Sequence, residues 1–570
     1  MKKGNIKLYG LIAAVMLLGP MGCKEELNLD NPNAPTLAGS VVDESGFVSF
    51  IQGGIYNVGF SRGADWLGDS YFSLPWGYHE LMADNIGASA SNNQITNIAQ
   101  PLSITLDDAS VLNNPAKQVD IIRVYNSRAA SGAGNNLLYY QWGNMYALNN
   151  ACNQILANTD HIQYNMDKAT SIATIQAFCY WWKGYAYAGI GSLYVSGIIA
   201  DDASPSVTAS TKITNDYVDK SAIIARSNYY FNLAITTLQT IKASMDLPTY
   251  NSVLGELIPS ICQVGNGGVM DPDMFIRNIN TMLARNILVN KLSTFVNGVP
   301  GSPITKSLMT PMQSADWASI LTLTTNGVQQ GDKIFTARST AISSNTIFTA
   351  TSGNVAAQTA AKASSSTFKI SERFLSYLSS RGDARFVNNF NTSSAYTDNY
   401  AYTTRYTMVN GGTGANSSYV YGNRTPGAYE VVIASSYEEN ELMKAEANIQ
   451  SGNIDLGVAS IDAVRTYMGA GLAPIGNGKT LAQALTELVS ERRVSLAFRG
   501  LSFYDNRRYG WSYDVSLGGG NYKQVVIHAG TVNTNATINY NFLDYWDIPA
   551  DETVLNPPSA SSAPITNPNY

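Results

Sequence analysis

The sequence predicts a mainly α-helical protein, in which helical hairpins of the tetratricopeptide type build a superhelical scaffold and a loop-rich, irregular portion carries few short strands. Three observations favour this fold class. Apolar residues recur at helical spacing in several long segments, two such segments are joined by a short turn, and a central stretch loses the periodicity. Hydrophobic residues make up 45% of the 570 residues, which is ample for a large core.

Two adjacent segments have the clearest helical pattern. In residues 135–158 the apolar positions follow one another at spacings of four and three, interrupted once by Asn149. Residues 171–195 keep the same alternation, so Trp181 and Trp182 are expected in the core rather than in a cofactor site. The same pattern predicts two buried cysteines, and three glycines that admit a closely packed helix: Cys152, Cys179, Gly184, Gly189 and Gly191.

A later pair of segments predicts a helical hairpin. A helix over 436–450 stops at a Ser-Gly-Asn turn and a second helix covers 455–468, which is the layout of a tetratricopeptide unit without its full consensus. Such a hairpin buries its apolar face only by stacking on neighbours, which favours a superhelix over a four-helix bundle. Further helical patterns cover 221–242, 272–293 and 481–499.

Residues 300–430 differ in composition from the rest of the chain. They are rich in Ser, Thr, Ala, Asn and Gly, with weak periodicity, and are expected to form a loop-rich insertion. This stretch carries a cluster of tyrosines: Tyr396, Tyr400, Tyr402, Tyr406, Tyr419 and Tyr421. Two interpretations stay open, because the rings can be partly exposed stacking surfaces or can pack against the helices as a tyrosine-rich strand.

The first residues have the pattern of an export signal. Lysines precede an apolar run over 8–18, which is too short to span a bilayer. A glycine followed by Cys23 then resembles the site where a bacterial lipoprotein is cut and acylated, although Pro20 stands where Leu is usual. We predict a signal peptide over 1–22, lipid attachment at Cys23 and a flexible tether over 23–40. The alternative is an ordinary secretory signal with a chance cysteine.

Charge and the rarity of histidine and cysteine argue against several functions. The net charge is −6 and no Lys/Arg cluster offers a basic surface, so no nucleic acid is expected as a partner. The three histidines are widely scattered and no C-x-x-C pair occurs. This leaves little material for a catalytic triad or a metal site, so we predict no catalytic residue, metal or cofactor.

One segment matches a nucleotide-binding motif and has a simpler explanation. Residues 473–480 fit the relaxed Gly-rich loop that cradles phosphates, but they follow a helix instead of a buried strand. Thr480, with Gln483 three residues later, predicts a helix N-cap with a capping box. Nucleotide binding is therefore not expected.

Two charged patterns also have structural explanations. Arg381-Gly382-Asp383 matches an adhesion tripeptide, for which a turn after a helix over 371–380 is sufficient. A dense charge cluster in the late part of the chain can perturb pKa values as an active site does. We expect its members to form ion pairs that lock the last helix to the tail: Glu491, Arg492, Arg493, Asp505, Arg507 and Arg508.

These features together resemble the SusD/RagB family of outer-membrane nutrient-capture lipoproteins, nearly end to end. Residues 485–511 are similar to its late helix with Glu-Arg-Arg, Gly and Asp-x-x-Arg. Residues 545–558 and the closing ITNPNY resemble its Ile-Pro, Asn-Pro and Asn-Pro-x-Tyr signatures. Asp383 and Arg385 fit its Asp-x-Arg turn, and residues 275–292 fit its central Asn/Arg helix. The sequence departs from the family at FRGLS, residues 498–502, where an acidic residue usually precedes the glycine and an arginine follows two positions later.

The resemblance implies one SusD-like domain over 41–570. Its helical core would cover 41–300 and 430–510, separated by the 300–430 insertion, and 511–570 would form a C-terminal tail.

The resemblance also implies a function: binding without catalysis. A cell-surface lipoprotein of this family would capture an oligosaccharide and deliver it to a SusC-like TonB-dependent transporter, with its lipid in the outer membrane. The Lys-Glu-Glu after Cys23 is similar to the surface-export signal of Bacteroidetes lipoproteins. Three alternatives stay open: the same role for peptides, a surface glycoside hydrolase, and a repeat scaffold that binds only proteins.

The predicted ligand site lies in residues 63–89. Four aromatic residues occur there within thirteen positions, broken by Gly and Pro, so that no single helix can bury them all. Acidic and amide groups follow that can bond sugar hydroxyls. The predicted ligand-binding residues are Trp66, Tyr71, Trp76, Tyr78, Asp84 and Asn85. Buried loop aromatics are the structural alternative, and Trp317 and the later tyrosines are competing positions.

Overall fold

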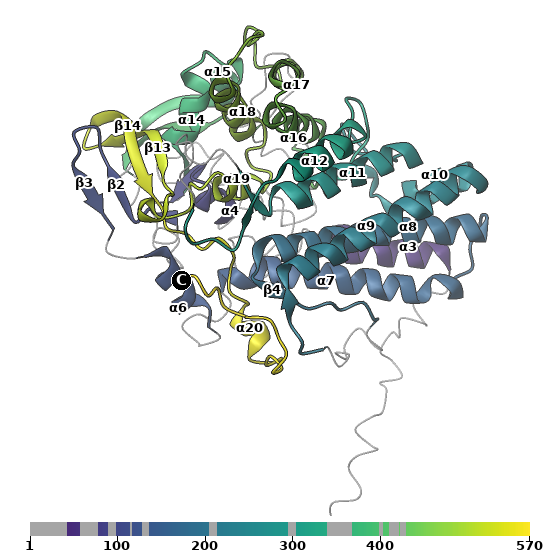
Figure 1. The fold of residues 1–570 in the computed structure, drawn as a ribbon. Coiled ribbons are helices and arrows are strands. Elements are labelled where there is room, and N and C mark those ends of the chain that lie inside the picture. Colours follow the sequence, from purple (N-terminus) through teal and green to yellow (C-terminus); the bar gives the residue numbers. More distant parts are fainter. Residues whose placement is uncertain are drawn as a thin grey trace, which may run out of the picture.

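The computed structural model describes residues 43–57, 78–88, 99–114, 117–127, 136–203, 214–293, 304–338, 368–397, 403–409, 421 and 429–570. Helices dominate these residues and the strands are short, which confirms the predicted fold class. Figure 1 shows two groups of helices stacked on each other, with a small sheet beside the upper group.

The lower group of helices lies side by side (Figure 1). It comprises α3 (Glu44–Gln52), α7 (Leu137–Asn158), α8 (Lys168–Leu193), α9 (Lys220–Ser244) and α10 (Leu247–Leu257). The helices predicted from the apolar spacing at 135–158, 171–195 and 221–242 are thereby confirmed. Aspartate side chains accept backbone N–H groups at the starts of α8, α9 and α10: Asp167, Asp219 and Asp246.

Glycines on α8 allow its neighbours to approach closely. A Cβ atom on Gly184 would lie 2.7 Å from the Phe231 ring of α9. A Cβ atom on Gly189 would lie 2.9 Å from the sulfur of Met145 on α7. The prediction that these glycines admit neighbouring helices is confirmed, and any larger residue there would push the helices apart.

The upper group comprises α11 (Pro272–Leu288), α12 (Ser314–Thr325), α16 (Tyr437–Gln450), α17 (Ile454–Tyr467) and α18 (Leu481–Ser495). Helices α16 and α17 form the predicted hairpin, with Gly452 in the left-handed conformation at the turn. Helix α18 ends earlier than its pattern predicts, because Phe498 has a positive φ of 62° and turns the chain away. Helix α11 also ends earlier, because the chain enters the short strand β6 (Lys291–Leu292).

The segment with the nucleotide-binding motif is a helix start, as predicted. Thr480 accepts the backbone N–H of Gln483, and the Gln483 side chain accepts the backbone N–H of Thr480. The loop amides that would face a phosphate are already bonded to carboxylates. The N–H of Gly478 donates to Asp455 and that of Ile475 donates to Asp462.

The largest sheet among the described residues joins distant parts of the chain. Its strand order is β13 (Asn521–His528), β14 (Thr531–Asn539), β2 (Ser103–Thr105) and β3 (Val111–Asn113), all antiparallel. Strand β12 (Val431–Val432), which precedes α16 in the sequence, pairs with β8 (Thr336–Ala337). This short pair leads the chain into the helical hairpin.

The described part of the 300–430 segment holds more regular structure than its composition indicates. It contains α12, α14 (Glu372–Ser379), α15 (Ala384–Asn389) and the hairpin β10 (Phe390–Thr397) to β11 (Thr403–Met408). The α14 helix and the turn at Gly382 after it agree with the prediction. The α12 helix was not predicted, because its Thr- and Ser-rich sequence obscures the apolar spacing of its buried residues Trp317 and Ile320.

The described tyrosines of this segment pack against the protein. Tyr421 is buried and its hydroxyl donates to the Val494 carbonyl at 3.1 Å. Tyr406 lies on β11 and packs edge to face on Phe386. Tyr396 lies on β10, and the remaining members of the cluster, Tyr400, Tyr402 and Tyr419, lie outside the described residues.

The core is rich in aromatic rings. Trp181 and Trp182 are fully buried and contact each other edge to face, as their helical phase predicts. The buried thiols of Cys152, Cys179 and Cys262 are free, and burial raises the pKa of Cys179 well above its ordinary value.

The late charge cluster confirms the predicted ion pairs in part. Glu491, Arg492, Asp505 and Arg508 form ion pairs, whereas Arg493 and Arg507 donate to amide and backbone carbonyl oxygens, and the hydrogen bond to the tail runs from Arg507 to the Asp544 carbonyl. Glu491 accepts hydrogen bonds from Arg381, Arg385 and Arg465 at 2.9–3.0 Å, and its side chain is fully buried. Burial by itself raises the pKa of Glu491, but these guanidinium groups outweigh burial and hold it well below its usual range. The other members bond Glu446, Asp505, Asn506 and backbone carbonyls of distant segments. The cluster therefore ties α18 and α19 (Ser502–Arg508) to the rest of the fold.

Candidate functional site

The aromatic residues of the predicted ligand site lie mostly outside the part of the chain that the structure describes. Trp66, Tyr71 and Trp76 are outside the described residues, as is the predicted lipid-attachment residue Cys23. Tyr78 begins the short helix α4 (Tyr78–Met82), and only its backbone is described. The aromatic part of the predicted site therefore stays a prediction.

The two polar members of the predicted site are buried and engaged. Asp84 accepts two hydrogen bonds from Arg373, each of 2.8 Å, and one from the Tyr540 hydroxyl. The amide of Asn85 donates to Glu80 and Ser502. Both side chains thus hold α4 to other segments, and in this structure a sugar hydroxyl does not reach them.

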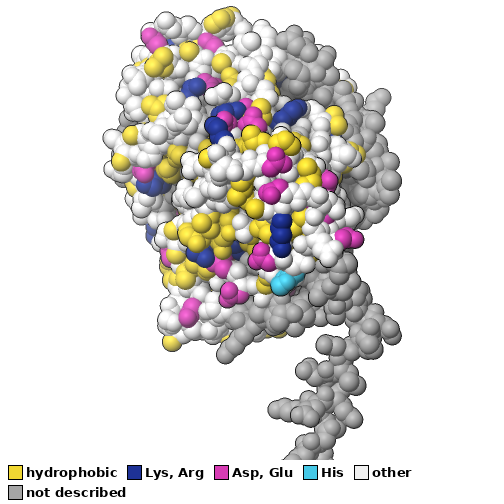
Figure 2. Space-filling model, turned by 90° about the vertical axis from the view of Figure 1, so that its right-hand side faces the viewer, with side chains coloured by type: hydrophobic (Ala, Val, Ile, Leu, Met, Phe, Trp, Pro, Cys, Tyr) yellow, Lys and Arg dark blue, Asp and Glu magenta, His cyan; other side chains and the backbone are white. Residues whose placement is uncertain are grey.

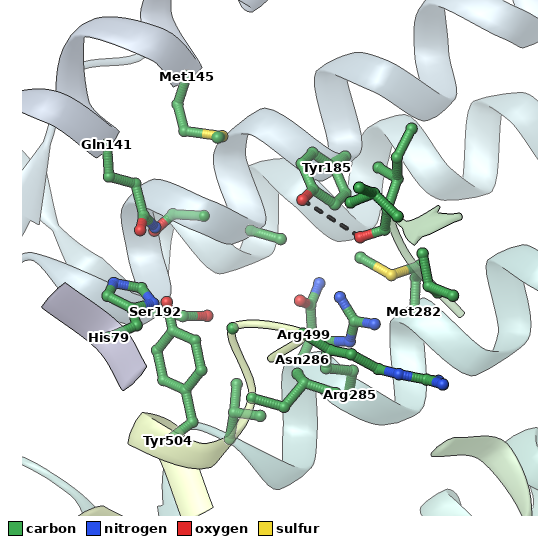
Figure 3. A pocket seen from close by; sticks show the side chains of 18 residues that line it. His79, Gln141, Met145, Tyr185, Ser192, Met282, Arg285, Asn286, Arg499 and Tyr504 are labelled. Atoms are coloured by element: carbon green, nitrogen blue, oxygen red, sulfur yellow. Dashed lines mark hydrogen bonds between the residues drawn. The ribbon is translucent and has the colours of Figure 1, made fainter. Parts of the chain in front are cut away.

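Two adjoining cavities lie in the described part of the protein, each with a distinct chemistry. The first, here called the methionine cavity, encloses about 90 Å³ between α7, α8, α11, β12 and the loop before α19. Its walls include Met145, Met282, Val289, Ile433 and Leu501. Figure 3 shows Gln141, His79, Ser192 and Tyr504 on one side of it and Tyr185 and Met282 on the other.

The polar atoms of the methionine cavity are few and mostly engaged. Gln141 donates to the Gly189 carbonyl at 2.8 Å, and Tyr185 donates to the Ile433 carbonyl at 3.4 Å. Burial lowers the pKa of His79 to about 3, so its ring is neutral at physiological pH. The cavity is therefore an apolar space with a small number of neutral and cationic hydrogen-bonding groups.

The second, here called the tyrosine cavity, encloses about 180 Å³ and is more polar. It lies between the loop after α10, the turn after α12, the start of α16 and the end of α17. Three half-buried tyrosines line it: Tyr429, Tyr437 and Tyr467. The rings of Tyr437 and Tyr467 meet edge to face with centroids 4.9 Å apart. The α16–α17 hairpin explains this contact, because it brings the start of one helix beside the end of the other.

Both of these tyrosines are hydrogen-bond donors at neutral pH. Burial, with a contribution from nearby glutamates, raises the pKa of Tyr437 and of Tyr467 to about 12. The Tyr467 hydroxyl lies 3.5 Å from the Asn266 side-chain oxygen. The rings thus offer apolar faces with neutral polar edges.

Charged side chains surround the tyrosines in opposite-sign pairs. Glu430 accepts the backbone N–H groups of Asn266 and Gly267 and the Asn266 side-chain amide at 3.0–3.1 Å, and it lies 3.4 Å from Arg338. Asp332 forms a two-point pair with Arg277. The acidic groups accept hydrogen bonds and the arginines and amides donate them. The cavity lining holds three carboxylates, of Asp332, Glu430 and Glu438, and two guanidinium groups, of Arg338 and Arg499.

The two cavities meet at Val432 and Arg499, which line both. Arg499 donates to Ser436 at 3.0 Å and pairs with Glu438. Phe498, which precedes Arg499, and Ser435, which precedes the Ser436 that Arg499 bonds, have positive φ values of 62° and 64°, which is uncommon outside glycine. Arg499 is also one of the two positions at which the sequence departs from the family pattern, the other being Ser502. The first departure therefore falls between the two cavities.

Sequence reasoning did not identify the cavity residues. The predicted hairpin was a usable signal, since it implies that Tyr437 and Tyr467 lie close together. Arg285 and Asn286 sit in the Asn/Arg helix that was assigned a family role without a site. No sequence signal connects these residues to Arg499, which lies in the loop before α19 and is more than 200 positions from Arg285 in the sequence.

Comparison with known proteins supports the fold. No family model and no curated protein matches the chain. Among solved structures, a SusD-like carbohydrate binding protein from Bacteroides vulgatus aligns with 92% of this chain and 98% of its own, at a TM-score of 0.52 and 15% identity. A putative sugar binding protein from the same species covers 93% and 99% at 0.53 and 15%. A SusD homolog from Bacteroides thetaiotaomicron covers 84% and 91% at 0.52 and 13%. The chain has the SusD-like fold, which confirms the resemblance found in its sequence.

Two further properties of the described residues concern metal binding and membrane insertion. These residues contain no group of three His, Cys, Asp or Glu side chains placed to hold a metal ion. In that same part of the chain, every helix is too short or too polar to cross a bilayer. On the face drawn in Figure 2, the described Lys and Arg side chains lie near Asp and Glu rather than in a basic patch of their own.

Proposed function

We propose that the protein is a cell-surface lipoprotein that binds an oligosaccharide without cleaving it and delivers it to a SusC-like TonB-dependent transporter. The SusD-like fold, shared with solved carbohydrate-binding proteins, supports this role. The observation that carries the proposal is the tyrosine cavity, where aromatic rings stand beside carboxylate, amide and guanidinium groups.

This combination suits the chemistry of a sugar. A pyranose ring has apolar C–H faces that pack on aromatic rings, while its hydroxyls both donate and accept hydrogen bonds. Glu430 and Asp332 supply acceptors, and Arg338, Arg499 and Asn266 supply donors. The volume of about 180 Å³ exceeds the roughly 150 Å³ of an engineered cavity that takes up benzene, so one sugar ring fits.

The arrangement favours binding over hydrolysis. A glycosidase needs one carboxylic acid with a raised pKa opposite a second carboxylate. The cavity carboxylates of Glu430, Glu438 and Asp332 are instead each held in an ion pair with an arginine. Peptides remain an alternative ligand class, because the same groups can bond peptide amides.

The binding site can be tested by substitution of its rings. Calorimetry against a panel of oligosaccharides is expected to show that Tyr437→Ala weakens binding tenfold or more, by loss of ~1–3 kcal/mol of stacking, whereas Tyr437→Phe keeps most of it. Tyr229→Ala, on an exposed tyrosine of α9, is the matched control. Circular dichroism verifies the fold of each variant.

The predicted N-terminal site is tested in the same measurement. If Trp66→Ala and Trp76→Ala reduce affinity while Tyr437→Ala does not, the ligand binds at residues 63–89 instead. If the wild-type protein retains no oligosaccharide, or releases shorter products, the binding function is wrong or the protein is a hydrolase.

The lipid anchor is tested at Cys23. Cys23→Ala is expected to prevent acylation and to release the protein or leave it uncut, because one or more acyl chains are what would hold it in the outer membrane. Fractionation of cells, with Cys262→Ala as a control at a buried thiol, measures this. A Cys23→Ala protein that stays stably in the outer membrane would refute the anchor. Copurification of a barrel protein tests the transporter.

A further inference from the structure

The methionine cavity contains a buried acceptor whose bonding is incomplete. Asn286 on α11 is 2% exposed, and its side-chain amide nitrogen donates to Ser227 at 3.0 Å and to the Asn228 side-chain oxygen at 2.8 Å. The Ser227 hydroxyl donates to the Gly184 carbonyl at 2.7 Å and must therefore accept from Asn286, which identifies this end of the amide as the nitrogen. The opposite end, Oδ1, has no hydrogen-bond partner among the described residues. A buried acceptor left in this state costs free energy that a ligand N–H would recover.

The neighbouring residue provides a donor. Arg285 uses Nε and Nη2 in a two-point pair with Glu439, and the described residues give its Nη1 no hydrogen bond. Burial lowers the pKa of Arg285, but Glu439 outweighs burial and raises it, so the guanidinium stays charged. Figure 3 shows Arg285, Asn286 and Arg499 together on the cavity wall. One acceptor and one donor therefore lie side by side in an apolar space.

The size of the space limits what can enter it. Its volume of about 90 Å³ is half that of the tyrosine cavity, about 180 Å³, and lies below the roughly 150 Å³ of an engineered cavity that takes up benzene. A group of three or four heavy atoms fits, whereas a second sugar ring does not. The apolar walls formed by Met145 and Met282 favour a group that ends in a methyl.

From these observations we propose that the methionine cavity receives the N-acetyl group of an amino sugar whose ring occupies the tyrosine cavity. The acetamido N–H would donate to Asn286 Oδ1, the acetamido carbonyl would accept from Arg285, and the methyl would lie against Met145 and Met282. Val432 and Arg499 line both cavities, and the acetamido group would pass between them. This specificity rests on the proposed sugar-binding function and narrows the ligand to N-acetylated saccharides.

Matched monosaccharide pairs test this inference directly. N-acetylglucosamine, N-acetylgalactosamine and N-acetylmannosamine differ from glucose, galactose and mannose only at the acetamido group. Protein labelled with ¹³C at its methionine methyls is titrated with each sugar at millimolar concentration. The Met145 and Met282 signals should shift with at least one N-acetylated sugar and not with its parent, while exposed Met166 serves as the internal control. Affinity for that sugar should exceed that for its parent by tenfold or more.

A cavity-filling variant gives the second readout. Ala188→Leu adds bulk to the wall of the methionine cavity, and Ala188→Ser is the matched control of similar size. Ala188→Leu should remove the preference for the N-acetylated sugar and leave binding of the parent sugar unchanged.

The two proposals fail in different ways. Sugars that bind with equal affinity whether acetylated or not, or that shift no signal of Met145 or Met282, would overturn the N-acetyl inference and leave sugar binding intact. An absence of binding by every sugar and oligosaccharide in the panel would overturn sugar binding itself.

Discussion

The buried charge cluster around Glu491 and the tyrosine cavity are built from the same residue types, carboxylates and guanidinium groups, but they differ in surroundings. Glu491 and Arg385 are fully buried and bonded only to the protein. In the tyrosine cavity the side chains of Glu430 and Arg338 are 16% and 10% exposed and border open space. A cluster of charge alone therefore does not mark a binding site, and it is the cluster beside a cavity with aromatic walls that we propose for ligand binding.

The two sets of charged side chains also differ in whether a ligand can supply hydrogen-bond partners to them. In the Glu491 cluster the protein itself supplies every partner that the carboxylate uses. In the tyrosine cavity a ligand hydroxyl can insert beside the existing pairs. The first set should therefore determine stability and the second set binding, which substitutions can separate.

The largest effect is expected at Glu491. Glu491→Gln leaves three arginines without their shared carboxylate, and removal of one partner of a buried ion pair typically costs about 3–5 kcal/mol. Chemical denaturation measures the loss. Glu487→Gln is the control, because Glu487 pairs with Arg465 alone and its side chain is 38% exposed, so its loss should stay below about 1 kcal/mol. Equal losses at the two positions would contradict the comparison.

A pH-dependent effect is expected at Glu80, which lies beside the methionine cavity residue His79. Burial raises the pKa of Glu80 from 4.5 to about 7 and lowers that of His79 from 6.5 to about 3. The folded state retains the Glu80 proton as the pH rises from 4.5 to 7, so this residue's contribution to stability is lost over that range. The His79 contribution is present above pH 6.5 and is lost as the pH falls toward 3. The two slopes oppose each other between pH 4.5 and 6.5.

Glu80→Gln should expose the slope due to His79. Relative to the wild type, the free energy of unfolding of the variant should increase with pH by about 1.4 kcal/mol per unit, to a total of about 3 kcal/mol between pH 4.5 and 7. Urea denaturation at a series of pH values measures the difference. Parallel pH profiles for variant and wild type would show that Glu80 is not protonated in the folded state.

The smallest effect on stability is expected at Glu430. Glu430→Gln keeps an oxygen that accepts the backbone N–H groups of Asn266 and Gly267. It loses the charge and the hydrogen bond from the Asn266 side-chain amide, so the cost should be about 1 kcal/mol. Binding of the oligosaccharide should nevertheless weaken. A variant with wild-type affinity and a stability loss as large as that of Glu491→Gln would assign Glu430 to the fold instead of the site.

The sequence allowed the helical scaffold to be predicted well, for a local reason. The spacing of apolar residues in α7 and α8 indicates a buried face, and Gly184 indicates a closely packed neighbour. Each of these signals lies within a single segment of the chain. Helix α12 was not predicted, because its Thr and Ser residues interrupt the apolar spacing. The ion pairs of Glu491 were predicted as a class, but not their partners.

The candidate cavities were not predictable in the same way. Each takes its wall from at least three segments, and the relative position of Asn286, Tyr437 and Arg499 follows only from how the helices stack. The buried state of Asp84 likewise depends on Arg373 and Tyr540, which are hundreds of residues away. A polar residue in a Gly-rich stretch gives no local sign of such remote partners.

The pairing of β14 with β2 has a consequence for how the chain folds. Residues 537–539 complete a sheet begun by residues 103–105, so the entropy of closing a loop of more than 400 residues must be met before that sheet exists. Such long-range contacts form slowly and late. Until the residues up to about 540 are available to pair, the hairpin of β2 and β3 has an unpaired edge. Factors that protect exposed strand edges are therefore expected to raise the yield of folded protein.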